Sequence, residues 1–157
     1  MPGDGGPRTL QAMDPAALFR VLNLAVLPAW LLIVAAPRWK GTQAVVHAVW
    51  IPVLLGLVYG SLLLAAETPE GAGFGSLDGV RLFFQDPHAL LAGWVHYLVF
   101  DLFVGAWESR DAARRGISAV WVAPCLLLTL MLGPLGLLAY LVLRFAQTRS
   151  GTLVEAG

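Results

Sequence analysis

The stretch from Leu90 to Asp111 reads LLAGWVHYLVFDLFVGAWESRD. It is apolar over most of its length, with Trp94 and Trp107 near its two ends and Asp101 almost midway between them. Tryptophan rings favour the headgroup level of a bilayer, and these two would lie roughly 20 Å apart along a helix. The stretch therefore predicts a membrane-spanning helix with a carboxylate near its centre.

Asp101 is the first candidate for a functional residue. A charged aspartate at the bilayer centre costs about 2.5–3.5 kcal/mol on insertion scales. Such a residue is retained where it faces a polar partner or a wet cavity. We therefore expect Asp101 to meet other polar groups of the protein.

The composition of the whole chain is typical of an integral membrane protein. Of its 157 residues, 58% are hydrophobic and only 13% are charged, and the mean hydropathy is +0.73. A soluble domain carries about a quarter charged residues, so this chain has too few to coat a globule. Its net charge of zero gives no indication of nucleic-acid binding. The single cysteine, Cys125, excludes an intrachain disulfide, and we predict no metal site.

Four apolar segments are long enough to cross a bilayer, which takes about 20 residues as a helix. We predict an all-α integral membrane four-helix bundle of antiparallel spans, with a short interfacial segment between the second and third. The predicted spans are residues 15–36, 43–66, 88–107 and 117–143. They form one transmembrane domain over residues 14–145, between a disordered tail at 1–13 and a polar tail at 146–157. In the fourth span, Gly133 and Gly136 would allow a neighbouring helix to approach closely.

Prolines interrupt the first two predicted spans. Pro28 and Pro52 each remove a backbone donor and would kink a helix. The kinks would either splay the bundle and open a cavity or only shape its packing, and the sequence leaves both open. The connection at residues 67–88 is long enough to be a lid or a simple connector. Its part at 80–84 is typical of a short amphipathic turn at the interface.

The amino-terminal segment does not resemble a cleavable signal peptide, because Asp4 and Asp14 precede an apolar run that is too long for one. Many Ala, Gly, Leu, Val and Arg residues and no transit peptide favour a bacterial inner membrane over a plastid. The ten Lys and Arg residues divide equally between the two expected sides, so they do not fix the direction of insertion. The lipid bilayer is the expected partner, and a homo-oligomer is left open.

Several polar residues would share the depth of Asp101, because antiparallel helices bring their centres to one level. Asn23 and Thr129 lie at that level, and Tyr59 lies about one turn away. Each can donate a hydrogen bond to a carboxylate. They are candidate partners of Asp101, either in an internal lock between helices or in a catalytic or ligand-polarising site.

His96 is the second candidate for acid–base chemistry, because a histidine near a buried carboxylate is a common arrangement. It would lie about 140° around the helix from Asp101, so the two would flank a groove. Glu108 and Asp111 are interpreted as solvated residues of a helix end that pair with nearby arginines. His47 would lie about 20 Å from the level of His96, which argues against a haem held by two histidines. We predict no cofactor.

Three patterns in the chain resemble a known family. They are SL-x-GV at 76–80, LAGWVHYL-x-FDLFVG at 91–105, and LT-x-M-x-GP-x-GL at 128–137. The chain resembles the abscisic-acid-deficient-four-like family over about residues 14–144. This is a family of small four-span membrane proteins whose plant member acts as neoxanthin synthase in plastids. Ala106 departs from the family pattern, in which an arginine often follows the final glycine of the middle run.

The resemblance implies chemistry on a carotenoid or other isoprenoid. Neoxanthin forms when an epoxide of violaxanthin opens and a neighbouring proton is lost, which requires an acid and a base but no redox cofactor. The resemblance implies Asp101 as the acid on the epoxide oxygen and His96 as the base. The expected substrate contacts are Trp94, Tyr97, Asn23, Tyr59 and Thr129. We thus predict an isomerase; the alternative is a non-catalytic lipid- or pigment-binding module or a subunit of a complex.

Overall fold

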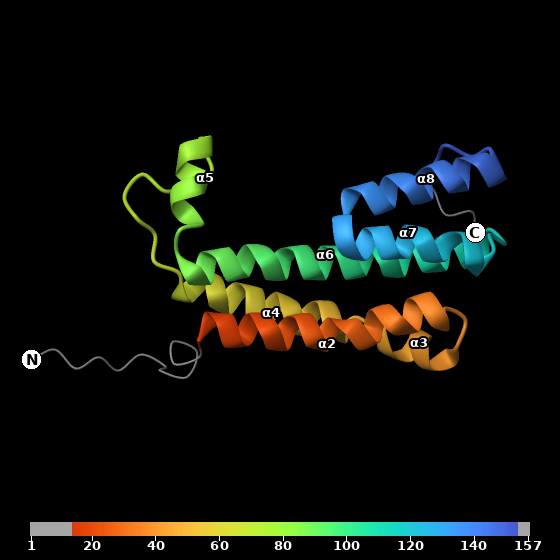
Figure 1. Ribbon diagram of the computed structural model, residues 1–157, viewed down its shortest axis with the longest axis horizontal. Helices are drawn as coiled ribbons and strands as arrows, with labels where there is room; N and C mark the ends of the chain where they lie inside the picture. Colours follow the sequence, from red (N-terminus) through yellow and green to blue (C-terminus); the bar gives the residue numbers. More distant parts are fainter. Residues whose placement is uncertain (1–13, 154–157) are drawn as a thin grey trace, which may run out of the picture. The chain divides into compact units, whose positions relative to one another are not determined.

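The computed structural model describes residues 14–153, which contain helices and no strand (Figure 1). The helices are α2 (Pro15–Ala35), α3 (Lys40–Val45), α4 (Trp50–Ala65), α5 (Leu77–Phe83), α6 (Pro87–Arg114), α7 (Ala119–Leu132) and α8 (Pro134–Thr148). The all-α prediction is confirmed for this part of the chain. The predicted tail at 1–13 and the end of the polar tail, residues 154–157, lie outside the described residues.

Within residues 14–153, three helical segments are long and apolar enough to cross a membrane. They are Pro15–Ala35, Lys40–Ala65 and Pro87–Arg114. Ala119–Leu132 is also apolar but has only 14 residues, fewer than the roughly 20 that a span needs. The protein is therefore a helical, membrane-associated protein with three candidate spans, and the four-span bundle stays a prediction.

The described residues divide into two compact units. The first unit contains residues 14–26 and 50–99, and the second contains residues 27–49 and 100–153. Helices α2 and α6 each contribute to both units, since each runs across a boundary.

The second predicted span starts earlier than expected and is interrupted. Residues 46–49 separate α3 from α4. Pro52 lies in the first turn of α4, where it cannot donate to the carbonyl of Ala48, and its ring would crowd that carbonyl. The sequence predicts a kink at Pro52, whereas the structure has an interruption of the helix just before it.

The fourth predicted span is not one helix, because α7 ends at Leu132 and α8 begins at Pro134. Gly133 joins them with φ +42° and ψ −95°, a conformation that favours glycine. The two helices pack against each other and are joined at one end (Figure 1). A Cβ at Gly136 would collide with the backbone of Thr129, so this glycine permits the close packing. Residues 117–143 therefore form a helical hairpin, which corrects the single helix expected there.

In the first unit, local capping residues define α5 and the start of α6. Ser76 Oγ accepts a hydrogen bond of 3.0 Å from Gly79 N and caps α5. Asp86 Oδ1 accepts from the backbone nitrogens of His88 and Ala89 at 2.9 Å each. The short segment predicted between the second and third spans is thus the helix α5. It is followed by α6, whose first turn is capped by Asp86.

Candidate functional site

The first unit contains an open groove of about 760 Å³ beside α2 and α6. Its walls are apolar and rich in aromatic rings. The lining residues are Pro15, Ala16, Phe19, Phe84, Pro87, Leu90, Leu91, Gly93, Trp94 and Tyr97. Two of the predicted substrate contacts, Trp94 and Tyr97, are among them. Gly93 leaves room for Phe84, since a Cβ there would lie 2.7 Å from the phenyl ring.

The aromatic side chains of the groove pack in a row. The centroid of the Trp94 ring lies 5.3 Å from that of Phe19 and 5.3 Å from that of Tyr97. Trp94 Nε1 donates a hydrogen bond of 3.1 Å to Asn23 Oδ1, and Asn23 Nδ2 donates one of 2.7 Å to the carbonyl of Phe19. Asn23 therefore orients the indole that forms the groove wall.

His96 and Tyr59 lie together outside the groove lining. Their ring centroids are 6.1 Å apart, with an angle of 49° between the ring planes. His96 is exposed and Tyr59 is half-buried. His96 belongs to the first unit and Asp101 to the second. Their proposed roles as base and acid stay predictions.

His88 lies in the first turn of α6. Its Nδ1 lies 3.8 Å from Asp86 Oδ1. Its Nε2 is buried and has no hydrogen-bond partner among the described residues. The adjoining cavity, next to Leu18 and Ser61, has only about 10 Å³, the lower limit for one water molecule. The cavity beside His88 is thus too small for a substrate.

In the second unit, Asp101 is buried against the turn between α7 and α8. Only 9% of it is exposed, and a Cβ at Gly133 would lie 2.8 Å from Asp101 Oδ1. The carboxylate thus lies beside Gly133, the residue that ends α7 and precedes α8. The predicted contacts of Asp101 with Asn23, Tyr59 and Thr129 stay predictions.

Glu108 is fully buried, so its interpretation as a solvated residue is wrong. Thr129 Oγ1 lies 3.0 Å and 3.1 Å from the two carboxylate oxygens of Glu108 and 3.0 Å from the carbonyl of Cys125. The error arose because Trp107 was taken as the end of the span, whereas α6 continues to Arg114 and α7 covers this face. Thr129 therefore links α7 to α6, and its role as a substrate contact stays a prediction.

Asp111 is also buried, with 2% exposed, and it is the centre of an ion-pair network. Tyr140 Oη donates to Asp111 Oδ2 at 2.6 Å, and Arg144 Nε donates to the same oxygen at 2.8 Å. Arg115 Nε donates to Asp111 Oδ1 at 2.9 Å. Arg144 also donates to the carbonyl of Thr152 at 2.6 Å. The network joins α6, α8 and the segment after α8.

A sequence signal for these buried carboxylates existed. Asp101, Glu108 and Asp111 are spaced by seven and three residues, so they share one face of a helix. Tyr140 and Arg144 are four residues apart and share a face of α8. Among residues 14–153, no group of three or more His, Cys, Asp or Glu side chains is arranged to hold a metal ion.

The fold and the two sites define a class: an all-helical, membrane-associated protein with an aromatic groove and a buried carboxylate network. A family model described as ABA DEFICIENT 4-like matches residues 17–140, and the chain belongs to this family. The resemblance carried by residues 91–105 is thereby confirmed.

Comparison with curated proteins gives a plant relative. Protein ABA DEFICIENT 4, chloroplastic, of Arabidopsis thaliana is 29% identical over 136 residues, which cover 81% of this chain and 60% of the relative. The chain thus spans about 60% of the length of the curated relative that it matches. No solved structure matches the chain.

Proposed function

We propose that the protein binds a carotenoid or other isoprenoid and isomerises it by acid–base chemistry without a cofactor. The observation that carries the binding part is the groove of about 760 Å³ beside α2 and α6. Ligand pockets commonly have about 300–1,000 Å³, so this groove has room for a ring and the adjoining part of a long polyene.

The chemistry of the groove wall suits a flat hydrocarbon. The described residues that line it include no charged side chain. Phe19, Trp94 and Tyr97 present aromatic surfaces against which conjugated double bonds can stack. The hydrogen bond from Trp94 to Asn23 holds the indole in place before the ligand arrives, which lowers the entropic cost of binding.

The proposed reaction adds one proton to the substrate and removes another from it. An acid protonates an epoxide oxygen, the carbon–oxygen bond opens, and a base removes a proton from a neighbouring carbon to form a new double bond. No electron leaves the substrate, so the product is an isomer. We assign the acid to Asp101 and the base to His96, as the family resemblance implies.

A second candidate function is a non-catalytic lipid- or pigment-binding module or a subunit of a complex. It is favoured by the position of Asp101 against Gly133 and by the ion pairs of Asp111, which suit structural roles. For either function we propose a multi-pass protein of a bacterial inner membrane, based on the composition of the chain.

The experiment is to express the chain in a host that makes epoxy-carotenoids and to separate the pigments by chromatography with mass analysis. We expect a new isomer of unchanged mass in cells with the wild-type protein. Asp101→Asn and His96→Gln should abolish the isomer while the purified proteins keep their helical content and thermal stability. The matched control is Trp121→Leu, which changes an exposed residue of α7 that does not line the groove and should leave turnover unchanged.

The outcomes separate the two functions. A bound pigment without a new isomer would favour the binding module. Loss of thermal stability in Asp101→Asn, with pigments unchanged in all hosts, would assign Asp101 a structural role and contradict the isomerase.

A further inference from the structure

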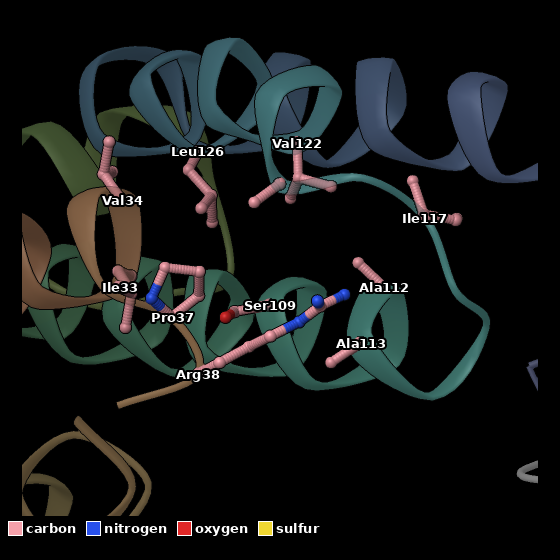
Figure 2. Close-up of a pocket in the computed structure, with 11 residues that line it drawn as sticks. Ile33, Val34, Pro37, Arg38, Ser109, Ala112, Ala113, Ile117, Val122 and Leu126 are labelled. Atoms are coloured by element: carbon pink, nitrogen blue, oxygen red, sulfur yellow. The ribbon is translucent and has the colours of Figure 1, made fainter. Parts of the chain in front are cut away.

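A second pocket lies in the second unit, at the end of α2 (Figure 2). It has about 20 Å³ of space that a water molecule could occupy, room for a group such as an oxygen atom of a ligand. The residues that line it are Ile33, Val34, Pro37, Arg38, Ser109, Ala112, Ala113, Ile117, Ala119, Val122 and Leu126. Most of the wall is apolar, and two side chains supply polar atoms.

Ser109 supplies the first of these polar atoms. The residue is 5% exposed, and its hydroxyl points into the pocket (Figure 2). Ser109 lies on α6 and is one of the residues that line the pocket. A hydroxyl at this position can donate a hydrogen bond to a ligand oxygen or a water molecule in the pocket.

Arg38 supplies the second polar group. Its side chain runs along the pocket, away from Pro37 and toward the end formed by Ala112 and Ala113 (Figure 2). No carboxylate of the described residues pairs with it, whereas Arg115 and Arg144 both pair with Asp111. The guanidinium is therefore available to an anion from outside the protein.

The neighbouring sequence places this pocket at the headgroup level of a membrane. Trp39 is 59% exposed and lies between two cations, Arg38 and Lys40. Exposed tryptophans and cations gather where the hydrocarbon meets the headgroups. Apolar side chains from α2 and α7, such as Ile33 and Val122, form the rest of the wall.

We propose that this pocket binds the phosphate headgroup of an anionic phospholipid. The Arg38 guanidinium would pair with the phosphate, because its fixed fork of donors matches phosphate oxygens. The Ser109 hydroxyl would donate to a phosphate or ester oxygen that enters the pocket. The apolar walls favour a lipid over free phosphate, since a free ion would gain nothing from them. This proposal does not depend on the carotenoid-binding groove.

The experiment is native mass spectrometry of the full chain in mild detergent, titrated with phosphatidylglycerol, phosphatidylcholine or inorganic phosphate. We expect phosphatidylglycerol to bind most tightly, since the phosphate of phosphatidylcholine is balanced by its own cation. Arg38→Gln should weaken phosphatidylglycerol binding roughly tenfold, because a charge-assisted pair is lost. Ser109→Ala should weaken it a few-fold, and Arg38→Lys should retain part of the binding.

The matched control is Arg149→Gln, which removes one exposed positive charge of the same unit outside the pocket. It should change phosphatidylglycerol binding by less than about twofold. The site would be overturned if Arg149→Gln weakened phosphatidylglycerol binding as much as Arg38→Gln, or if Arg38→Gln did not weaken it. Inorganic phosphate that binds as tightly as the lipid, with the same dependence on Arg38, would overturn the lipid as its ligand.

Discussion

Arg144 Nε lies 2.8 Å from Asp111 Oδ2, and each residue is only 2% exposed. This buried ion pair connects the last turns of α8 to the carboxyl-terminal part of α6. Without Arg144, the buried carboxylate of Asp111 would keep Arg115 and Tyr140 as partners but lose one of its two cations.

Arg144→Met should therefore destabilise the protein by about 1.5–3 kcal/mol, the range for a lost hydrogen bond to a charged group. The measurement is unfolding in detergent followed by circular dichroism. Arg149→Gln, which removes an exposed charge five residues further on, should change stability by less than about 1 kcal/mol. Equal stability of Arg144→Met and the wild type would contradict the structural role of the pair.

The hairpin of α7 and α8 predicts that its two ends lie on the same side of the membrane. The 14 residues of α7 rise about 21 Å, less than the roughly 30 Å of the hydrocarbon core. Tyr140 and Arg144 return to Asp111, near the end of α6. We expect Ser118 and Gly151 to lie on the same side of the membrane.

The measurement is labelling of Ser118→Cys and Gly151→Cys with a membrane-impermeant maleimide, in a background where Cys125, the only cysteine, is replaced by alanine. Both cysteines should react from the same side of sealed vesicles. Reaction from opposite sides would restore the four-span bundle predicted from the sequence.

Gly133→Ala should destabilise the protein, because the residue has φ +42° and a Cβ would crowd Asp101 Oδ1. The positive φ alone should cost an alanine about 1–2 kcal/mol. The substitution should cost less in an Asp101→Ala background, since the crowding is then relieved. Gly60→Ala in α4, where a Cβ would meet no atom within 4 Å, should be neutral or slightly stabilising. Equal effects at the two glycines in thermal unfolding would argue against this turn geometry.

Thr129→Val should destabilise the protein by about 1–3 kcal/mol, because it removes the hydroxyl beside the buried carboxyl of Glu108. Glu108→Gln should cost less, because an amide can still bond to Thr129. The two variants can be compared by denaturant unfolding in the same detergent. A larger loss in Glu108→Gln would mean that the charge of Glu108 has a partner other than Thr129.

The sequence predicted the parts of the fold that local chemistry determines. The apolar run that forms most of α6 is visible without a structure. Trp94 and Tyr97, predicted as substrate contacts, line the groove, and their contact with a substrate stays a prediction. The extent of α6 was underestimated, because a tryptophan marks the membrane interface only when no other helix covers it. Trp107 is instead packed against Tyr140, with ring centroids 5.6 Å apart.

The rest of the candidate site depends on which helices are neighbours, and one sequence does not reveal this. Phe19 and Phe84 contribute to the groove although nothing in their local sequence distinguishes them from other apolar residues. The sequence indicates close helix packing at Gly133, whereas the structure has a turn there. Glycine is suited to both, because it lacks a side chain and adopts positive φ. The burial of Glu108 follows from that turn, because it folds α7 and α8 onto α6.

The absorption spectrum of the purified protein tests the central claim most directly. The wild-type chain, expressed in a carotenoid-producing bacterial host and purified in mild detergent, should retain a polyene that is identified by extraction and mass analysis. Trp94→Leu should lose most of the pigment, because it removes the central ring of the groove wall, while Trp121→Leu should keep it. A colourless wild-type protein, or equal pigment in Trp94→Leu and Trp121→Leu, would contradict the groove as the isoprenoid site.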